Sequence, residues 1–167
     1  MLVALVAFAC KSVPIEDRPP IAVPAGLTAN DVELAILYDL AQQNFPTDLT
    51  PGQQISNNQL KALLLTYRSV DGRKPGWYPE SAQPGLICAG YDSGRHYLRV
   101  SIQYDDTTVK TRIIESRGLD QESGRIHKSA IRWLDGLEVQ IRRALGQIAA
   151  AHAIDGREPA AVPRRSN

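Results

Sequence analysis

The chain has 167 residues, which is enough for one domain with a hydrophobic core and short for two. Its 19 basic and 18 acidic side chains nearly cancel, and this balance argues against a dedicated nucleic-acid-binding protein. No apolar run reaches the roughly 20 residues that span a bilayer. Two cysteines and three scattered histidines form neither a disulfide framework nor a metal-ligand motif, so we expect no metal and no cofactor.

The first ten residues, MLVALVAFAC, are similar to the end of a bacterial lipoprotein signal. They supply a short apolar core, and small residues stand at Ala7 and Ala9, where a signal peptidase needs them before Cys10. The bulky residue between the alanines and the missing basic residue ahead of the core depart from the pattern. We expect residues 1–9 to be a signal peptide, either truncated or read from a downstream start codon, and Cys10 to carry the lipid. The alternatives are a plain cleaved secretory signal and a buried N-terminal segment with a core cysteine.

Residues 11–27 hold four prolines and no amphipathic period, which favours extended backbone. At about 3 Å per residue, such a stretch would hold a domain up to about 50 Å from a surface. We therefore predict a lipidated cysteine with a slack tether over 10–27, one domain over 28–151 and a disordered tail over 152–167. Inner-membrane lipoproteins often have an aspartate directly after the lipidated cysteine. This chain has Lys11 there, so its resemblance to bacterial lipoproteins implies the outer membrane.

Two amphipathic helices are expected at the start of the domain. Residues 28–44 have apolar side chains at helical spacing, and Asn30 with Glu33 gives a capping-box signature. A second capping box begins at Ser56, and its helix ends before the turn residues 70–76.

Alternation of apolar and polar residues then predicts antiparallel strands. The clearest runs are 86–92, 95–105 and 108–116. A shorter run at 76–81 is typical of an edge strand, because Pro79 cannot donate to a ladder.

The longest helix is expected over 123–151, where apolar residues recur every three or four positions. The order α-α-β-β-β-α, with one apolar face on each element, predicts an α+β two-layer sandwich. Its antiparallel three- to four-stranded meander would be covered on one face by helices. Trp77 and Trp133 are expected to anchor the core, and Cys88 to behave as a small buried hydrophobe.

Short motifs in residues 76–145 resemble a group of small, uncharacterised proteobacterial lipoproteins. The matching motifs are Gly76-Trp77, Pro84-Gly85-Leu86-Ile87-Cys88-Ala89, Val100-Ser101-Ile102-Gln103-Tyr104, Ile126-His127 and Trp133. That family runs from its first helix almost directly into the Gly-Trp motif, whereas this chain has an extra loop and helix near 46–70. The resemblance implies an address in the cell envelope and no particular reaction.

The start of the last helix holds the first group of candidate binding residues. His127 lies beside Arg125 and Lys128, which suggests a binding or acid–base role. The alternative is a histidine that packs against the sheet or caps a neighbouring strand. His96 points with the apolar residues of its strand and is expected at the interior or rim.

The open face of the sheet holds the second group. Tyr97, Arg99 and Arg112, with Lys110, are predicted on the strand face away from the helices. Basic groups beside an aromatic ring are typical of single-stranded nucleic-acid platforms. The same pattern is also expected on the solvated side of any amphipathic sheet.

These patterns favour a lipid-anchored envelope protein that is a binding module and not an enzyme. Its membrane contact would be the lipid on Cys10, and its sheet face or strand edge would engage an envelope protein or peptidoglycan. A small enzyme with a site around His127 is the alternative, although no catalytic residue is assigned. A nucleic-acid-binding module on the basic sheet face is disfavoured by the net charge of +1.

Overall fold

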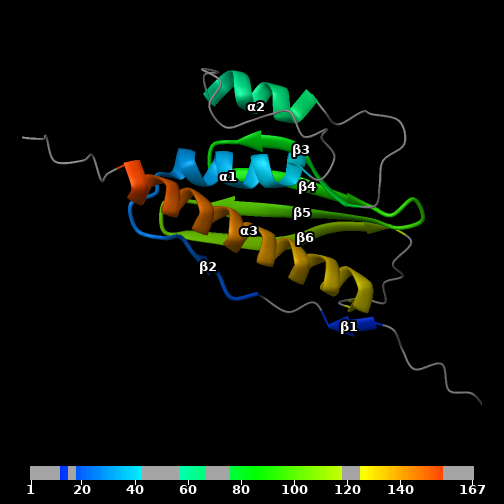
Figure 1. Cartoon of the computed structure of the whole chain (residues 1–167). Coiled ribbons are helices and arrows are strands. Elements are labelled where there is room, and N and C mark those ends of the chain that lie inside the picture. The colour runs from blue at the N-terminus through cyan, green and yellow to red at the C-terminus, as the bar shows by residue number, and fades with distance from the viewer. Residues whose placement is uncertain (1–11, 15–17, 43–56, 67–75, 118–124, 156–167) are drawn as a thin grey trace, which may run out of the picture.

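The computed structural model describes residues 12–14, 18–42, 57–66, 76–117 and 125–155. In chain order the elements are β1 (Ser12–Pro14), β2 (Ile21–Ala22), α1 (Ala29–Gln42), α2 (Asn57–Thr66), β3 (Gly76–Gln83), β4 (Leu86–Asp92), β5 (Tyr97–Tyr104), β6 (Thr108–Arg117), β7 (Arg125–His127) and α3 (Lys128–Asp155). Five strands form an antiparallel sheet of order β2-β6-β5-β4-β3, and β1 pairs with β7 in a separate ribbon (Figure 1). The predicted α+β class and the β3–β6 meander are confirmed.

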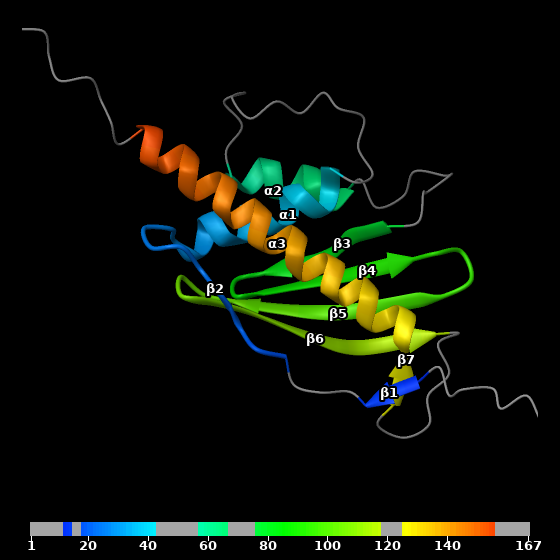
Figure 2. The same cartoon turned by 60° about the horizontal axis from the view of Figure 1, so that its bottom comes forward.

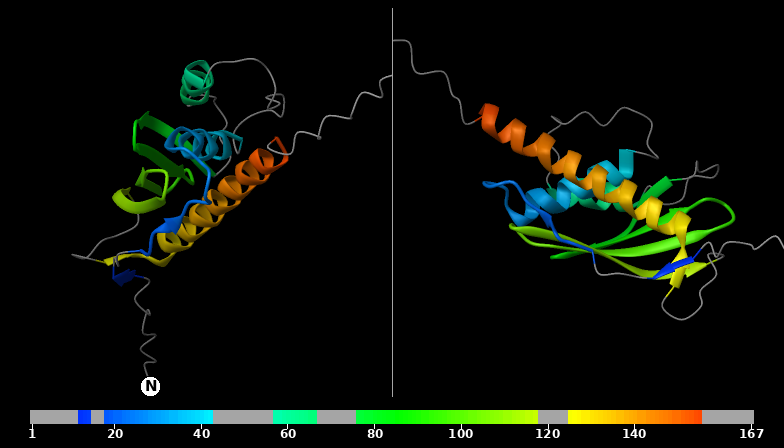
Figure 3. Two further views of the ribbon diagram at one scale, coloured as in Figure 1. Left: turned by 90° about the vertical axis from the view of Figure 1, so that its left-hand side faces the viewer. Right: turned by 90° about the horizontal axis from the view of Figure 1, so that it is seen from below.

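The sheet and its helices form two layers. α1 and α3 lie over one face, which we call the inner face, and no described helix covers the opposite, outer face (Figures 2 and 3). α2 lies beside α1 near the β3 edge of the sheet, and the Lys61 ammonium is 2.5 Å from a carboxylate oxygen of Glu33. The predicted two-layer arrangement, with helices on one face only, is therefore confirmed.

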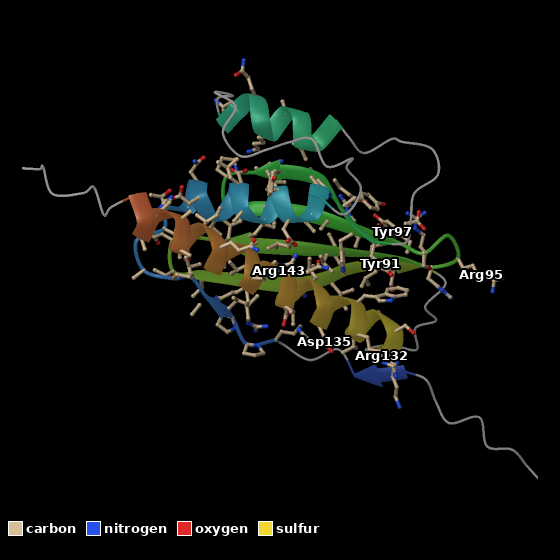
Figure 4. All side chains as sticks on the ribbon, viewed as in Figure 1. Tyr91, Arg95, Tyr97, Arg132, Asp135 and Arg143 are labelled. Atoms are coloured by element: carbon tan, nitrogen blue, oxygen red, sulfur yellow. The ribbon has the colours of Figure 1, made fainter. Side chains whose placement is uncertain are left out.

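Apolar side chains gather on the inner face, because successive residues of a strand point to opposite sides of the sheet. On β5 the buried residues are Leu98, Val100, Ile102 and Tyr104. The helices meet them with Val32, Ile36, Leu37 and Leu40 from α1 and Leu134, Leu137, Ile141 and Leu145 from α3. Both tryptophans pack at the core as expected: the Trp77 indole N–H donates to the Trp133 carbonyl at 3.2 Å. The Tyr91 ring stacks on the Trp133 ring with centroids 4.3 Å apart (Figure 4).

The first helix begins earlier than its predicted capping box. Thr28 is the N-cap: its hydroxyl accepts from the Asp31 amide at 3.3 Å, and its own amide donates to the Asp31 carboxylate at 2.8 Å. This reciprocal pair satisfies amides that the first turn leaves without partners. The predicted box at Asn30 and Glu33 is wrong, since Asn30 is already helical and Glu33 is buried. Ser56, the second predicted cap, lies outside the described residues.

The N-terminal stretch is part of the domain, and the slack tether predicted to end at residue 27 is wrong for residues 18–27. Ile21 and Leu27 are buried in the core, and β2 extends the sheet by pairing with β6. The Arg18 side chain is bound to Glu138 of α3 at 2.5 Å and also to Asp135. Prolines favour extended backbone, and extended backbone can equally form an edge strand. The predicted signal segment and Cys10 lie outside the described residues.

The last helix begins later than predicted because Arg125–His127 form β7, which pairs with β1. Its C-terminal end extends to Asp155, so residues 152–155 are helical and not part of a disordered tail. In the part of the chain that the structure describes, no helix is both long and apolar enough to cross a membrane.

Candidate functional site

The two predicted groups of binding residues lie in different parts of the molecule. Tyr97, Arg99 and Arg112 project from β5 and β6 on the outer face, as the strand alternation predicted. Arg125, His127 and Lys128 belong to β7 and the first residue of α3. The outer face is the better-defined candidate site, because its side chains form a connected polar network.

Glu80 of β3 is the centre of this network. The Tyr97 hydroxyl donates to one carboxylate oxygen at 2.5 Å, and the Arg99 Nε atom lies 2.7 Å from the other. The Glu80 side chain is only 6% exposed, although it lies on the face that no described helix covers. The Arg99 Nε–H does not point along a hydrogen-bond direction, so this contact is an ion pair without a hydrogen bond. A buried carboxylate is retained at such a site only when its charge is paired.

Glu80 lies on the outer face at a β-bulge of β3. The pairing of β3 with β4 shifts register between Pro79 and Ser81, so Glu80 has no opposite residue on β4. Alternation from Trp77, which is in the core, and Tyr78 on the outer face puts Glu80 on the outer face, and the bulge places Ser81, opposite Cys88, on that face as well. The short run 76–81 has no clear alternation in the sequence, so the acid that pairs with the basic residues was missed.

A close packing contact supports the carboxylate from beneath. Tyr78 and Gly90 are opposite one another on β3 and β4, and a Cβ atom at Gly90 would lie 2.7 Å from the Tyr78 ring and 2.8 Å from Glu80 Oε1. Glycine is therefore required for Tyr78 and Glu80 to lie flat against the sheet. Tyr78 is buried, and the outer face consequently has a packed floor at this position.

Tyr97 is held in its protonated form. Burial raises the pKa of its phenol well above the ordinary value of 10, and the hydrogen bond to Glu80 raises it further. The guanidinium of Arg117 lies over the Tyr97 ring, 4.3 Å from its centroid, and also pairs with Glu115 at 3.0 Å. Tyr97 is thus fixed at its hydroxyl by a carboxylate and on its ring by a cation.

The outer face is less basic than predicted, because two of its four cations are paired. Glu80 pairs with Arg99 and Glu115 pairs with Arg117. Among the described residues, Lys110 and Arg112 are exposed and have no salt bridge. These two side chains are the free positive charges of the face.

A shallow depression of about 240 Å³ lies at the Lys110 end of the outer face. It is lined by Pro84, Gly85, Leu86, Gln103, Tyr104, Asp105, Thr108 and Lys110. Gly85 has a positive φ of 78°, which lets the β3–β4 turn form here. The Tyr104 side chain points to the inner face, where burial raises the pKa of its phenol to about 12 and its hydroxyl donates to the Gln83 carbonyl at 3.2 Å. The lining thus has one carboxylate, Asp105, and one ammonium, Lys110, among otherwise neutral groups.

The group at the start of α3 is only partly described. Lys128 is exposed, whereas the side chains of Arg125 and His127 lie outside the described residues. The predicted acid–base role of His127 therefore stays a prediction. His96, predicted at the interior or rim, is half-buried with its ring 6.4 Å from that of Trp133.

The described residues also include side chains of the types that bind metals and a free cysteine. No three His, Cys, Asp or Glu side chains gather there as metal ligands would. Cys88 is a half-buried free thiol opposite Ser81 on the outer face, where its burial is less complete than a core hydrophobe's. No family model, curated protein or solved structure matches this chain. Function must therefore be inferred from the residues themselves.

Proposed function

We propose that the protein is a lipid-anchored component of the bacterial cell envelope and that its domain is a binding module. The lipid would be attached at Cys10, behind an apolar segment with alanines at the two positions that a signal peptidase reads. The domain would face the periplasm from the outer membrane. The observation that carries the binding role is the ordered outer face, where Glu80, Tyr97 and Arg99 fix one another beside the free cations.

The free charges define the kind of partner. Lys110 and Arg112 are exposed residues of β6 on either side of Thr111, so both project from the same face of the sheet. Cations on a flat face favour partners that present carboxylates, such as an acidic envelope protein or peptidoglycan. Arginine adds a planar donor pair that matches a carboxylate geometrically.

The buried network prepares this face for binding. Because Glu80 already holds Tyr97 and Arg99, those side chains lose little conformational freedom when a partner arrives. Arg117, which is stacked on Tyr97, lies at the far end of β6 from Lys110. The partner would therefore bind along the length of β6 and β5 and not at a single point.

Membrane fractionation of the native host tests the anchor. Wild-type protein is expected in the membrane fraction and Cys10→Ala in the soluble fraction, because acyl chains supply the membrane affinity. Cys88→Ser is the matched control and should stay with the membrane. Equal distribution of wild type and Cys10→Ala would remove the anchor from the proposal.

Site-specific photo-crosslinking in intact envelopes tests the binding face. A photoreactive residue at Arg112 should give a discrete crosslinked species, and the same residue at Val139, which is 63% exposed on α3, should not. Lys110→Glu, introduced with the probe at Arg112, should weaken the crosslinked band by repelling carboxylates. Equal crosslinking from both positions would show that the outer face is not a specific binding surface.

A further inference from the structure

The two ends of the sheet carry charges of opposite sign. The end that contains the β4–β5 turn has four exposed cations, Arg95, Arg117, Lys128 and Arg132, which we call the basic end. Arg117 is paired in register with Tyr97 at the start of β5, and the His96 ring lies 6.4 Å from that of Trp133. Figure 4 shows Arg95 and Arg132 at this same end.

The carboxylates at the basic end are fewer. Asp92 accepts a hydrogen bond from the Gly94 amide at 2.7 Å, Glu115 pairs with Arg117, and Asp135, three residues after Arg132, is bound to Arg18. The segments 15–17, which follows β1, and 118–124, which precedes β7, have two acidic residues each and lie outside the described residues. Among the described residues, Arg95, Lys128 and Arg132 have no salt bridge at this end.

The opposite end of the sheet is acidic. It holds Asp105 and Asp106 in the β5–β6 turn and Asp31 in the first turn of α1, against Lys110 beside Asp105 and His152 at 3.9 Å from Asp31, and we call it the acidic end. The two segments meet there, because the Val23 amide donates to the Thr107 carbonyl at 2.9 Å just before α1. Hydrogen bonds from the Thr107 hydroxyl and nearby amides lower the pKa of Asp105 to about 2, so it is charged at neutral pH.

The N-terminal chain leaves the domain at the basic end. Ser12 is paired with His127, the residue directly before α3. Cys10 precedes Ser12 by two residues, so their Cα atoms can be at most about 7 Å apart. An anchor at Cys10 would thus be attached close to the basic end, without the slack of a long tether.

We infer that the anchored domain stands on an anionic lipid surface with its basic end toward the phosphate headgroups. This orientation rests on the proposed lipid at Cys10, and the short connection and the charge polarity support it independently of each other. Strand β5 has eight residues, so the acidic end would stand about 24 Å farther from the lipid. The strands would then rise from the membrane, and the outer face would stay open to a partner from the side.

Paramagnetic broadening on nanodiscs tests the orientation. Residues 10–167 contain every described element and, as a Cys88→Ser variant, can be coupled through Cys10 to a maleimide lipid. This coupling makes the test independent of whether cells acylate Cys10. With gadolinium lipids in discs that contain phosphatidylglycerol, we expect the amide signals of residues 93–96 and 128–132 to be lost and those of residues 105–108 to be retained. Equal loss at both ends would overturn the inference.

Vesicle co-sedimentation of the uncoupled Cys10→Ala chain tests the role of charge. A cation near an anionic surface strengthens partitioning about fivefold, so Arg132→Gln should weaken binding to phosphatidylglycerol vesicles by about that factor. Arg142→Gln is the matched control, because it lies on the same helix about 15 Å farther from the basic end. We expect it to leave partitioning unchanged. Equal effects of the two variants, or equal binding to phosphatidylcholine vesicles, would contradict charge-guided orientation.

Discussion

The two faces of the sheet are built from the same strands and are held together by different forces. On β5 the inner face has Val100 and Ile102, which are buried against the helices, and the outer face has Tyr97 and Arg99. Inner-face packing is non-directional and depends on the area removed from water. The outer face depends on specific partners, because the carboxylate of Glu80 would be costly to bury without them. Alternation along one strand thus places the apolar core and the polar network on opposite faces of the sheet.

The largest effect is expected from the inner face. Ile102 is fully buried, and Ile102→Ala should lower the free energy of unfolding by about 3 kcal/mol, since it removes buried methyl groups and leaves a cavity. Ser101→Ala, one residue away on the outer face, is the control and should change it by less than about 1 kcal/mol. Chemical denaturation measures both. Similar losses of unfolding free energy in the two variants would contradict the claim that inner-face packing contributes most of the stability.

The next largest effect is expected at Glu80. Glu80→Ala should cost about 2 kcal/mol, because Arg99 loses its charge partner and the Tyr97 hydroxyl loses its acceptor while both stay partly buried. Glu80→Gln retains an acceptor and should cost less. In both variants the pKa of Tyr97 should fall toward its ordinary value, as an ultraviolet titration would detect. An unchanged Tyr97 titration would show that Glu80 does not organise this face.

A smaller, pH-dependent effect is expected at Asp39, a buried carboxylate on the helix layer. Burial raises its pKa, and the Arg143 guanidinium at 3.0 Å opposes that rise only in part. The folded state therefore keeps this proton to higher pH than the unfolded state does, so stability should fall as pH rises from the ordinary value of 3.8 through the folded pKa. Asp39→Asn should remove this component. The difference in unfolding free energy between wild type and Asp39→Asn should therefore change with pH. A difference that is constant over this range would contradict a raised pKa for Asp39.

The smallest effect is expected at Ile114, which is 48% exposed at the irregular pairing of β5 with β6. Ile114→Thr should change the free energy of unfolding by less than about 0.5 kcal/mol, because little apolar area is buried there. The thermal unfolding midpoint measures it. A large loss would show that this part of the outer face is packed against something else in solution.

The sequence was informative where structure is decided locally. Strands β4, β5 and β6 fall within one or two residues of their predicted bounds, because alternation is a property of neighbouring side chains. The same alternation correctly placed Arg99 and Arg112 on the outer face. Two-layer packing then follows, since each strand has one apolar face to cover.

The features that sequence missed are decided by distant pairing. β1, β2 and β7 have three, two and three residues, too short for any period, and they exist because β7 and β6 offer partners. Glu80 was missed because residues 76–81 are a short run without clear alternation, and a bulge after Pro79 interrupts their strand. Its pairing with Arg99 joins residues on strands that are not neighbours in the sheet. A pattern within one short segment cannot show which residues of two separate strands will form an ion pair.

The most direct test of the proposed function is the mass of the N-terminal peptide, taken from protein extracted from native host membranes. We expect a chain that begins at Cys10 and carries a diacylglyceryl group on its sulfur. An unmodified cysteine still preceded by residues 1–9 would contradict the anchor and the membrane orientation that depends on it.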